Sequence, residues 1–295
     1  MWERILIPLD GSDLAELAIP YTEELAGAFN AEVVLVYVSE PTESQYRHMH
    51  QLYIEEMAEK MRNRIKDYRV GMVNPIVLSG KPAEEIIDYA DKNDVSLIIM
   101  VSHGRSGITP WATGSVTNKV LHATKVPVLL IRATKPPQRA PGKHLLNRIL
   151  LPLDGSEAGE AAVPYIQELI DKLESEVILL GVAPAGQHVR TVGGLDYILY
   201  PEQHLELVKT EAGKYLDKVC HSLTGTKGTI GVELKVGDVA REIIKLAEET
   251  NTSLIAISAH GHSGIEKWVF GSIAHKILQA SNIPILVVRA PRRKE

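Results

Sequence analysis

Short apolar runs alternate with amphipathic stretches along the whole chain. The apolar runs are nearly continuous, which is typical of strands in a parallel sheet that helices cover on both faces. We predict strands at residues 5–9, 33–38, 75–78, 97–101 and 126–131, and again at 149–153, 177–182, 231–235, 254–257 and 283–288. In the first half, helical periodicity predicts helices at 15–28, 55–66, 83–92 and 115–123. This order of elements predicts an α/β fold with a doubly wound, five-stranded parallel sheet in each half.

A repeated motif indicates that the two halves are copies of one domain. The sequence RILIPLDGS at 4–12 returns as RILLPLDGS at 148–156, with eight of the nine residues identical. A second motif, HGRSGI at 103–108, returns as HGHSGI at 260–265. The spacing between the copies is far longer than the roughly 20–50 residues of a solenoid unit. We therefore predict two like domains at 1–134 and 147–295, joined by a proline-rich linker at 135–146.

Composition narrows the classes of protein that the chain can belong to. The 295 residues carry a formal net charge of −5 and include one cysteine, Cys220. A disulfide scaffold is thereby excluded, and a nucleic-acid partner is not expected, because nucleic-acid binders carry a basic face. No apolar run approaches the roughly 18 residues of a membrane-spanning helix, and the first strand begins too early to leave room for a signal peptide. We expect a cytoplasmic protein without membrane attachment.

Two stretches lack a regular pattern and differ most between the copies. They lie at 40–51 and 183–204, each between the second strand of a copy and the helix that follows. We expect both to be mobile loops that border the carboxyl ends of the strands, where ligands of such sheets bind.

A glycine-rich pattern follows the fourth strand of each copy. In the first copy, Ser102-His103-Gly104 is followed by nine residues and then by Gly114-Ser115-Val116. A glycine lets backbone N–H groups approach an anion closely, and the first N–H groups of a helix add a positive dipole end. Phosphate binding is one interpretation of the pattern. The other is a loop and a helix cap with nothing bound.

The second copy keeps the spacing, with Ala259-His260-Gly261 and then Gly271-Ser272-Ile273. This agreement adds little weight to either interpretation, because a duplication copies both kinds of loop.

An acidic residue follows the first strand of each copy. Asp10 comes shortly after Pro8, and Asp154 comes shortly after Pro152. A carboxylate at the end of this strand can accept hydrogen bonds from a ribose or from an adenine amino group. Alternatively, the Asp-Gly-Ser sequence only shapes the start of the next helix.

The chain resembles the universal stress protein family in its tandem two-domain form. The resemblance rests on ILIPLDGS at 5–12, GKPAEEI at 80–86 and SHGRSG at 102–107 followed by Gly114-Ser115. It covers nearly the whole chain apart from the linker and the two irregular stretches. It implies a Rossmann-like domain of the HUP type with strand order 3-2-1-4-5, which would bring Asp10 and Gly104 to adjacent strand ends.

The resemblance also implies a set of residues that contact an adenine nucleotide. In the first copy the set is Pro8, Asp10, Val38, Gly104, Gly114, Ser115 and Val116. In the second copy it is Pro152, Asp154, Val182, Gly261, Gly271, Ser272 and Ile273. We add Val101 and Ser258, whose N–H groups stay available at the start of the loop. His103 and His260 flank the loop, and each either touches a phosphate or caps the end of the strand. The family's phosphate loop begins with a glycine, which is Val101 in one copy and Ser258 in the other. A side chain there crowds the ligand, so we expect the copy with the smaller Ser258 to be the more permissive.

Three functions are compatible with these residues. The first is a regulatory protein that binds ATP, or ADP or AMP, together with Mg²⁺, and signals to a protein partner through ordering of 40–51 and 183–204. The second is a nucleotide-free interaction module. The third is a slow ATPase or autokinase, but neither copy has an evident general base or lysine clamp, so we assign no catalytic residue and no protein metal ligand.

Assembly is predicted from the sheet edges. The strands at 126–131 and 283–288 would lie at the sheet edges. An edge strand exposes unpaired backbone groups that can pair with another strand. We expect these two strands to pair with each other, and two tandem chains to form a homodimer.

Overall fold

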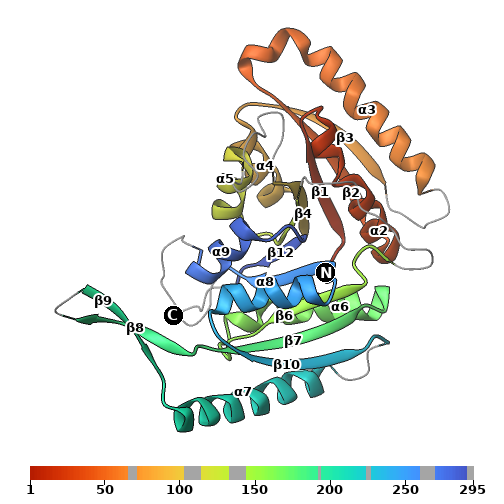
Figure 1. Ribbon diagram of the computed structural model, residues 1–295. Helices are drawn as coiled ribbons and strands as arrows, with labels where there is room; N and C mark the ends of the chain where they lie inside the picture. Colours follow the sequence, from red (N-terminus) through yellow and green to blue (C-terminus); the bar gives the residue numbers. More distant parts are fainter. Residues whose placement is uncertain are drawn as a thin grey trace. The chain divides into compact units, whose positions relative to one another are not determined.

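The computed structural model describes residues 1–65, 72–102, 114–132, 144–191, 194–223, 227–259 and 270–290, with the side chains of 187–198 left out. These residues form two compact units (Figure 1). The first unit contains the described residues of Met1–Leu145 together with Asn282–Arg289. The second contains those of Leu146–Ile265 and Phe270–Ser281.

The first unit is built on a parallel sheet with the predicted strand order. Its strands are β1 (Arg4–Leu9), β2 (Glu32–Ser39), β3 (Val73–Ser79), β4 (Leu97–Val101) and β5 (Val128–Ile131). The pairings give the order β3-β2-β1-β4-β5. The central strands are fully buried, as expected for a sheet with helices on both faces.

Helices surround this sheet in two groups. They are α1 (Asp13–Glu16), α2 (Ile19–Phe29), α3 (Arg47–Arg64), α4 (Pro82–Lys92) and α5 (Ser115–Ala123), with a 3-10 turn η1 (Pro41–Tyr46) before α3. Helix α2 contacts α3, and α4 contacts α5, which is the arrangement of a doubly wound sheet.

The second unit repeats the scheme. Its parallel strands are β6 (Arg148–Pro152), β7 (Glu176–Ala183), β10 (Ile230–Val236) and β11 (Leu254–Ser258), in the order β10-β7-β6-β11. Its helices are η2 (Gly159–Ala162), α6 (Val163–Leu173), α7 (Glu202–Ser222), α8 (Val239–Glu249) and α9 (Ser272–Ala280). The α/β fold predicted from the apolar runs is confirmed.

The last strand of the chain joins the first unit. Strand β12 (Ile285–Val288) pairs antiparallel with β5, and Leu286 lies opposite Leu129. The predicted pairing of these two strands is confirmed, because each supplies the backbone partners that a bare edge would lack. This pairing also explains why Asn282–Arg289 groups with the first unit instead of the second.

Three stretches differ from the prediction. The helix expected at 15–28 is two helices, α1 and α2, and Pro20 lies in the first turn of α2, where its missing N–H is tolerated. The prediction of a loop at 40–51 is wrong, because these residues form η1 and the start of α3. The prediction of a loop at 183–204 is also wrong. This stretch contains an antiparallel hairpin of β8 (Gly186–Thr191) and β9 (Gly194–Leu199) that leads into α7.

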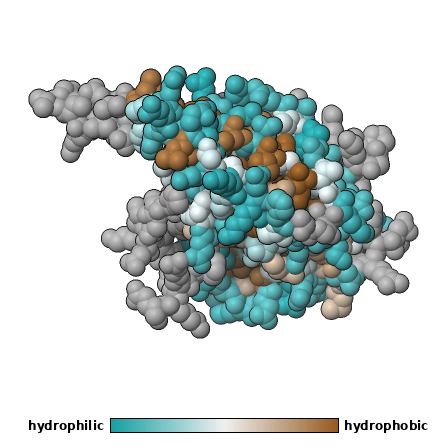
Figure 2. Space-filling model, turned by 90° about the horizontal axis from the view of Figure 1, so that it is seen from below, coloured by the Kyte–Doolittle hydropathy of each residue, from teal (hydrophilic) through white to brown (hydrophobic). Residues whose placement is uncertain are grey.

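Hydrophobic and hydrophilic residues are intermixed on the surface. On the face in Figure 2, hydrophobic residues form small groups among hydrophilic ones, which is typical of a surface in contact with water. None of the helices in the described part of the chain is both long and apolar enough to cross a membrane.

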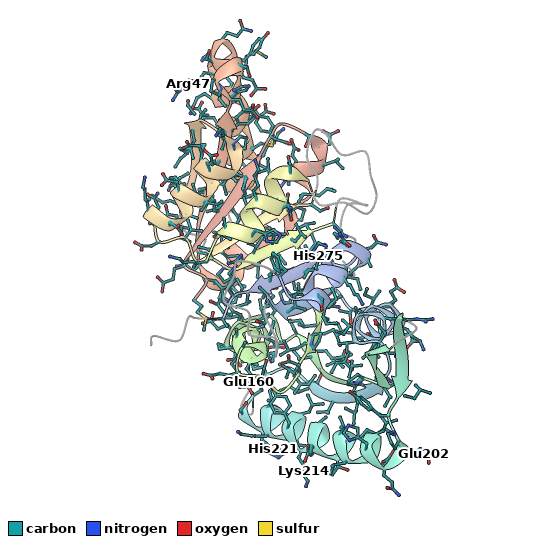
Figure 3. All side chains as sticks on the ribbon, turned by 90° about the vertical axis from the view of Figure 1, so that its left-hand side faces the viewer. Arg47, Glu160, Glu202, Lys214, His221 and His275 are labelled. Carbon is teal, nitrogen blue, oxygen red and sulfur yellow. The ribbon has the colours of Figure 1, made fainter. Side chains whose placement is uncertain are left out.

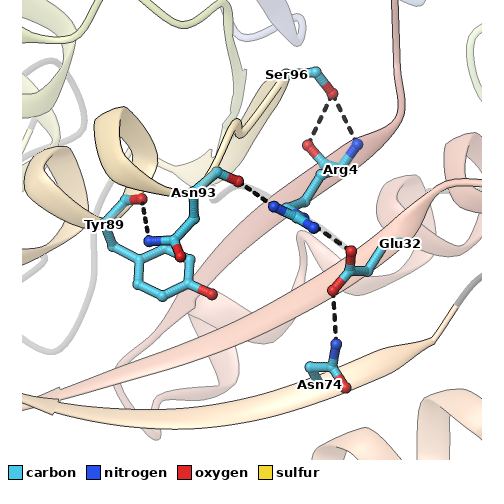
Figure 4. A network of polar contacts seen from close by, with 6 residues as sticks. All are labelled: Arg4, Glu32, Asn74, Tyr89, Asn93 and Ser96. Carbon is cyan, nitrogen blue, oxygen red and sulfur yellow. Dashed lines mark hydrogen bonds and ion pairs between the residues drawn. The ribbon is translucent and has the colours of Figure 1, made fainter.

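A polar network fastens the amino end of the first sheet (Figure 4). The Arg4 guanidinium donates to Glu32 Oε2 at 2.8 Å and also to the carbonyl of Asn93. Ser96 Oγ lies 3.0 Å from the Arg4 amide and 2.9 Å from its carbonyl. The network thus ties β1 to β2 and to the segment that enters β4.

The second unit repeats these contacts around Arg148. Its guanidinium donates to Glu176 Oε2 at 2.8 Å and to the carbonyl of Thr250, and Ser253 Oγ takes the place of Ser96 Oγ.

We expect Arg4→Ala to lower the free energy of unfolding by about 1–2 kcal/mol, because it leaves a half-buried carboxylate and a carbonyl without their charged donor. The control is Lys92→Ala, which removes the exposed pair with Asp88 and should cost less than about 0.5 kcal/mol. Urea unfolding of the purified chains measures both. Equal losses would show that the Arg4 network contributes no more than a surface ion pair.

Candidate functional site

The parallel pairing of β6 with β11 brings two predicted segments together in the second unit. Ile149 pairs with Leu254 and Leu150 with Ile255, so the carboxyl ends of both strands lie at the same edge of the sheet. Asp154 follows β6, and Ser258 ends β11. The two therefore face the same crevice, as the strand order implies.

The Asp154 side chain shapes the turn after β6. Its Oδ1 accepts from the Ser156 amide at 3.0 Å and from Ser156 Oγ at 2.6 Å, and the Gly159 amide donates to Ser156 Oγ at 2.9 Å. Gly155 has a φ of 82°, a value that residues with a side chain rarely adopt. The same turn follows β1, where Asp10 Oδ1 accepts from Ser12 at the same two distances.

The start of α9 has no side-chain cap among the described residues. Gly271 occupies the N-cap position and has no side chain with which to cap the helix. Its amide donates to the carbonyl of Ala259 at 3.0 Å. Among the described residues, a Cβ at 271 would meet only that carbonyl, at 3.7 Å, so these residues leave room in front of the helix start. Backbone N–H groups in such a place attract anions.

A cavity of about 710 Å³ lies between these segments. Every described residue predicted for the second copy lines it, namely Pro152, Asp154, Val182, Ser258, Gly271, Ser272 and Ile273. Residues far apart in the sequence thus meet around one space. Its volume falls in the range of about 300–1,000 Å³ that small-molecule sites have.

One wall of the cavity comes from α7 and was not predicted. Val208, Glu211, Ala212, Tyr215 and Leu216 line it and recur at helical spacing on one face of the helix. Their helical spacing could have predicted a helix with one face toward the ligand. We did not predict it, because the sequence before residue 205 has no regular pattern.

Lys214 lies on the outer side of α7, while Glu160 of η2 lies near the helix (Figure 3). Burial raises the pKa of Tyr215, and the nearby carboxylates of Glu160 and Asp154 raise it further. A tyrosine is protonated at neutral pH, so its hydroxyl can donate a hydrogen bond.

In the first unit the predicted residues hold equivalent places in the fold. Pro8 and Val38 lie in β1 and β2, and Asp10 follows β1. Gly114 is the N-cap of α5, its amide donates to Ser102 O at 2.7 Å, and Ser115 and Val116 open the helix. Val101 ends β4 with 7% of its surface exposed.

Four predicted residues cannot be placed. His103, Gly104, His260 and Gly261 lie outside the described residues. The roles of all the predicted residues in binding therefore stay predictions.

Comparison with known proteins identifies the family. The sequence model of the universal stress protein family matches residues 1–132 and again residues 146–289. The chain belongs to the universal stress protein family. It carries two copies of the family domain, as its repeated motifs predict.

Individual relatives match one copy at a time. A universal stress protein of Methanocaldococcus jannaschii is 30% identical over 145 residues, which are 46% of this chain and 85% of the relative. The universal stress protein YxiE of Bacillus subtilis is 29% identical over 150 residues, 49% of this chain and 100% of the relative.

Solved structures support the fold over the full length. A universal stress protein from Archaeoglobus fulgidus has a TM-score of 0.70 at 20% identity, and the match covers 98% of this chain and 99% of that one. At this level of identity the match supports the fold alone.

The turn that carries Asp154 gives a test of the site's construction. We expect Gly155→Ala to lower the free energy of unfolding by about 1–2 kcal/mol, because a Cβ is strained at this positive φ. The matched control is Gly213→Ala within α7, where a Cβ has none of the described residues within 4 Å and should stabilise the helix by about 0.5–1 kcal/mol. Chemical denaturation compares the two, and shifts of the same sign would contradict the assigned turn.

Proposed function

We propose that the chain binds an adenine nucleotide in the cavity of the second unit and acts as a nucleotide-dependent regulatory protein. One observation carries the proposal. The residues that the family resemblance marks for nucleotide contact, wherever the structure describes them in the second copy, line a single cavity.

The chemistry of the walls suits the parts of a nucleotide. The N–H groups at the start of α9 and the dipole of that helix favour phosphate oxygens. Asp154 provides a carboxylate oxygen for a ribose hydroxyl or an amino group. Leu180, Val182 and Ile257 supply apolar surface against which a base can pack.

ATP is the nucleotide we favour, with ADP and AMP as alternatives, because the helix start accommodates a chain of phosphates. Mg²⁺ would accompany a polyphosphate and would be held mainly by phosphate oxygens and water. Asp154 and Glu211 are the carboxylates on the cavity wall that could add a ligand. The described residues contain no cluster of three or more His, Cys, Asp or Glu side chains suited to a metal.

The cavity borders the segment through which binding could reach a partner. Ala183 and Pro184 line it and lead directly into the β8–β9 hairpin. A ligand that contacts them would favour one arrangement of the hairpin over others, in proportion to its difference in affinity.

We propose that a protein partner in the cytoplasm recognises the arrangement of the hairpin that the bound nucleotide favours. Association of two chains stays a prediction from the sequence.

Binding can be tested with one isosteric change. We expect Asp154→Asn to weaken ATP binding about 10-fold or more, because it removes the charge from a hydrogen bond to the ligand. Asp171→Asn is the control, since it removes the same charge from an exposed residue on α6 and should leave binding unchanged. Equilibrium dialysis with ATP, ADP and AMP measures the affinities.

Wild-type chain that binds none of the three at millimolar concentration would overturn the proposal. The protein would then be an interaction module that works without a nucleotide.

A further inference from the structure

The two repeats differ at the face where the second strand packs against the following helix. Tyr53 of α3 and Tyr215 of α7 establish which positions correspond. The Tyr53 hydroxyl lies 3.1 Å from Glu16 Oε1, and Tyr215 neighbours Glu160, which occupies the same place after its Asp-Gly-Ser turn as Glu16 does. With these tyrosines aligned, His50 of α3 corresponds to Ala212 of α7.

The strand partner of this position also differs. Strands β2 and β7 both begin at a glutamate that pairs with the arginine at the start of the first strand of its repeat, so Tyr37 corresponds to Gly181. The first repeat therefore has a tyrosine and a histidine where the second has a glycine and an alanine.

In the first repeat these two rings fill the space between strand and helix. Tyr37 and His50 stack with centroids 4.1 Å apart and an interplanar angle of 23°. They expose only 2% and 8% of their surface. His50 Nδ1 lies 3.2 Å from Ser39 Oγ, and Tyr53 packs edge-on against Tyr37.

In the second repeat the corresponding space is part of the cavity. Gly181 and Ala212 both line it. A Cβ at Gly181 would lie 3.0 Å from Leu216 Cδ1 and from Leu234 Cδ1, so these two leucines cover the position from which the Tyr37 ring extends in the first repeat. Ala212 carries no ring of its own, so the cavity wall beside it can take a flat ring from a ligand.

We propose that the wall at Ala212 forms the base subsite of the nucleotide cavity, and that the stacked rings of Tyr37 and His50 occupy the equivalent space in the first repeat. The chain then binds one nucleotide, in its second repeat. The inference rests on the proposed function and adds to it which repeat binds and which residues decide this. A buried, hydrogen-bonded pair of stacked rings resists displacement, because leaving would expose both rings to water.

The number of bound nucleotides tests the inference. Isothermal titration of the wild-type chain with ATP and Mg²⁺ should give one site per chain. Two sites would overturn the inference and leave the proposed function standing. No binding at millimolar ATP would overturn both.

A substitution tests the subsite itself. We expect Ala212→His, which places the first repeat's ring on the cavity wall, to weaken binding at least 10-fold. The matched control is Lys214→His, which adds the same ring to the exposed side of α7 (Figure 3) and should leave affinity unchanged. Circular dichroism and melting curves check that both variants fold. A folded Ala212→His chain with wild-type affinity would overturn the inference.

Hydrogen exchange gives a readout that needs no variant. ATP should slow amide exchange in peptides from β7 and α7 and leave those from β2 and α3 unchanged. Protection of β2 and α3 instead, or of both repeats equally, would contradict the assignment of the site to the second repeat.

Discussion

The parallel pairing of β6 with β11 is the constraint on which the site depends. It brings the carboxyl ends of two strands from opposite ends of the second repeat to one edge of a buried sheet. The turn after β6 and the start of α9 then line the same cavity. Because the strands are buried on both faces, this edge is held rigidly while the segments beyond it are free to vary.

The duplication shows which parts of the fold are under this constraint. The contacts of Arg4 recur around Arg148, and the hydrogen bonds of Asp10 recur around Asp154. These contacts position strands and turns, so both copies need them. The packing of the second strand against the following helix differs instead, with a stacked pair of rings in one repeat and a glycine and an alanine in the other. The two copies therefore share their framework and differ at this position.

Much of this could be predicted from the sequence, since the informative features are local. Continuous apolar runs predict buried strands, and an Asp-Gly-Ser sequence predicts a tight turn. The hairpin β8–β9 and the early start of α7 were missed because their polar residues lack a clear period. The stacking of Tyr37 on His50 could not be predicted, because it depends on the position of α3 relative to β2. No local sequence pattern determines that position.

The most direct test is a crystal structure of the full chain with ATP and Mg²⁺. The account predicts electron density for one nucleotide, with its base against the wall at Ala212 and its phosphates at the amides of Gly271, Ser272 and Ile273. Density for a base in the first repeat, or a second-repeat cavity that contains only water at saturating ATP, would contradict it.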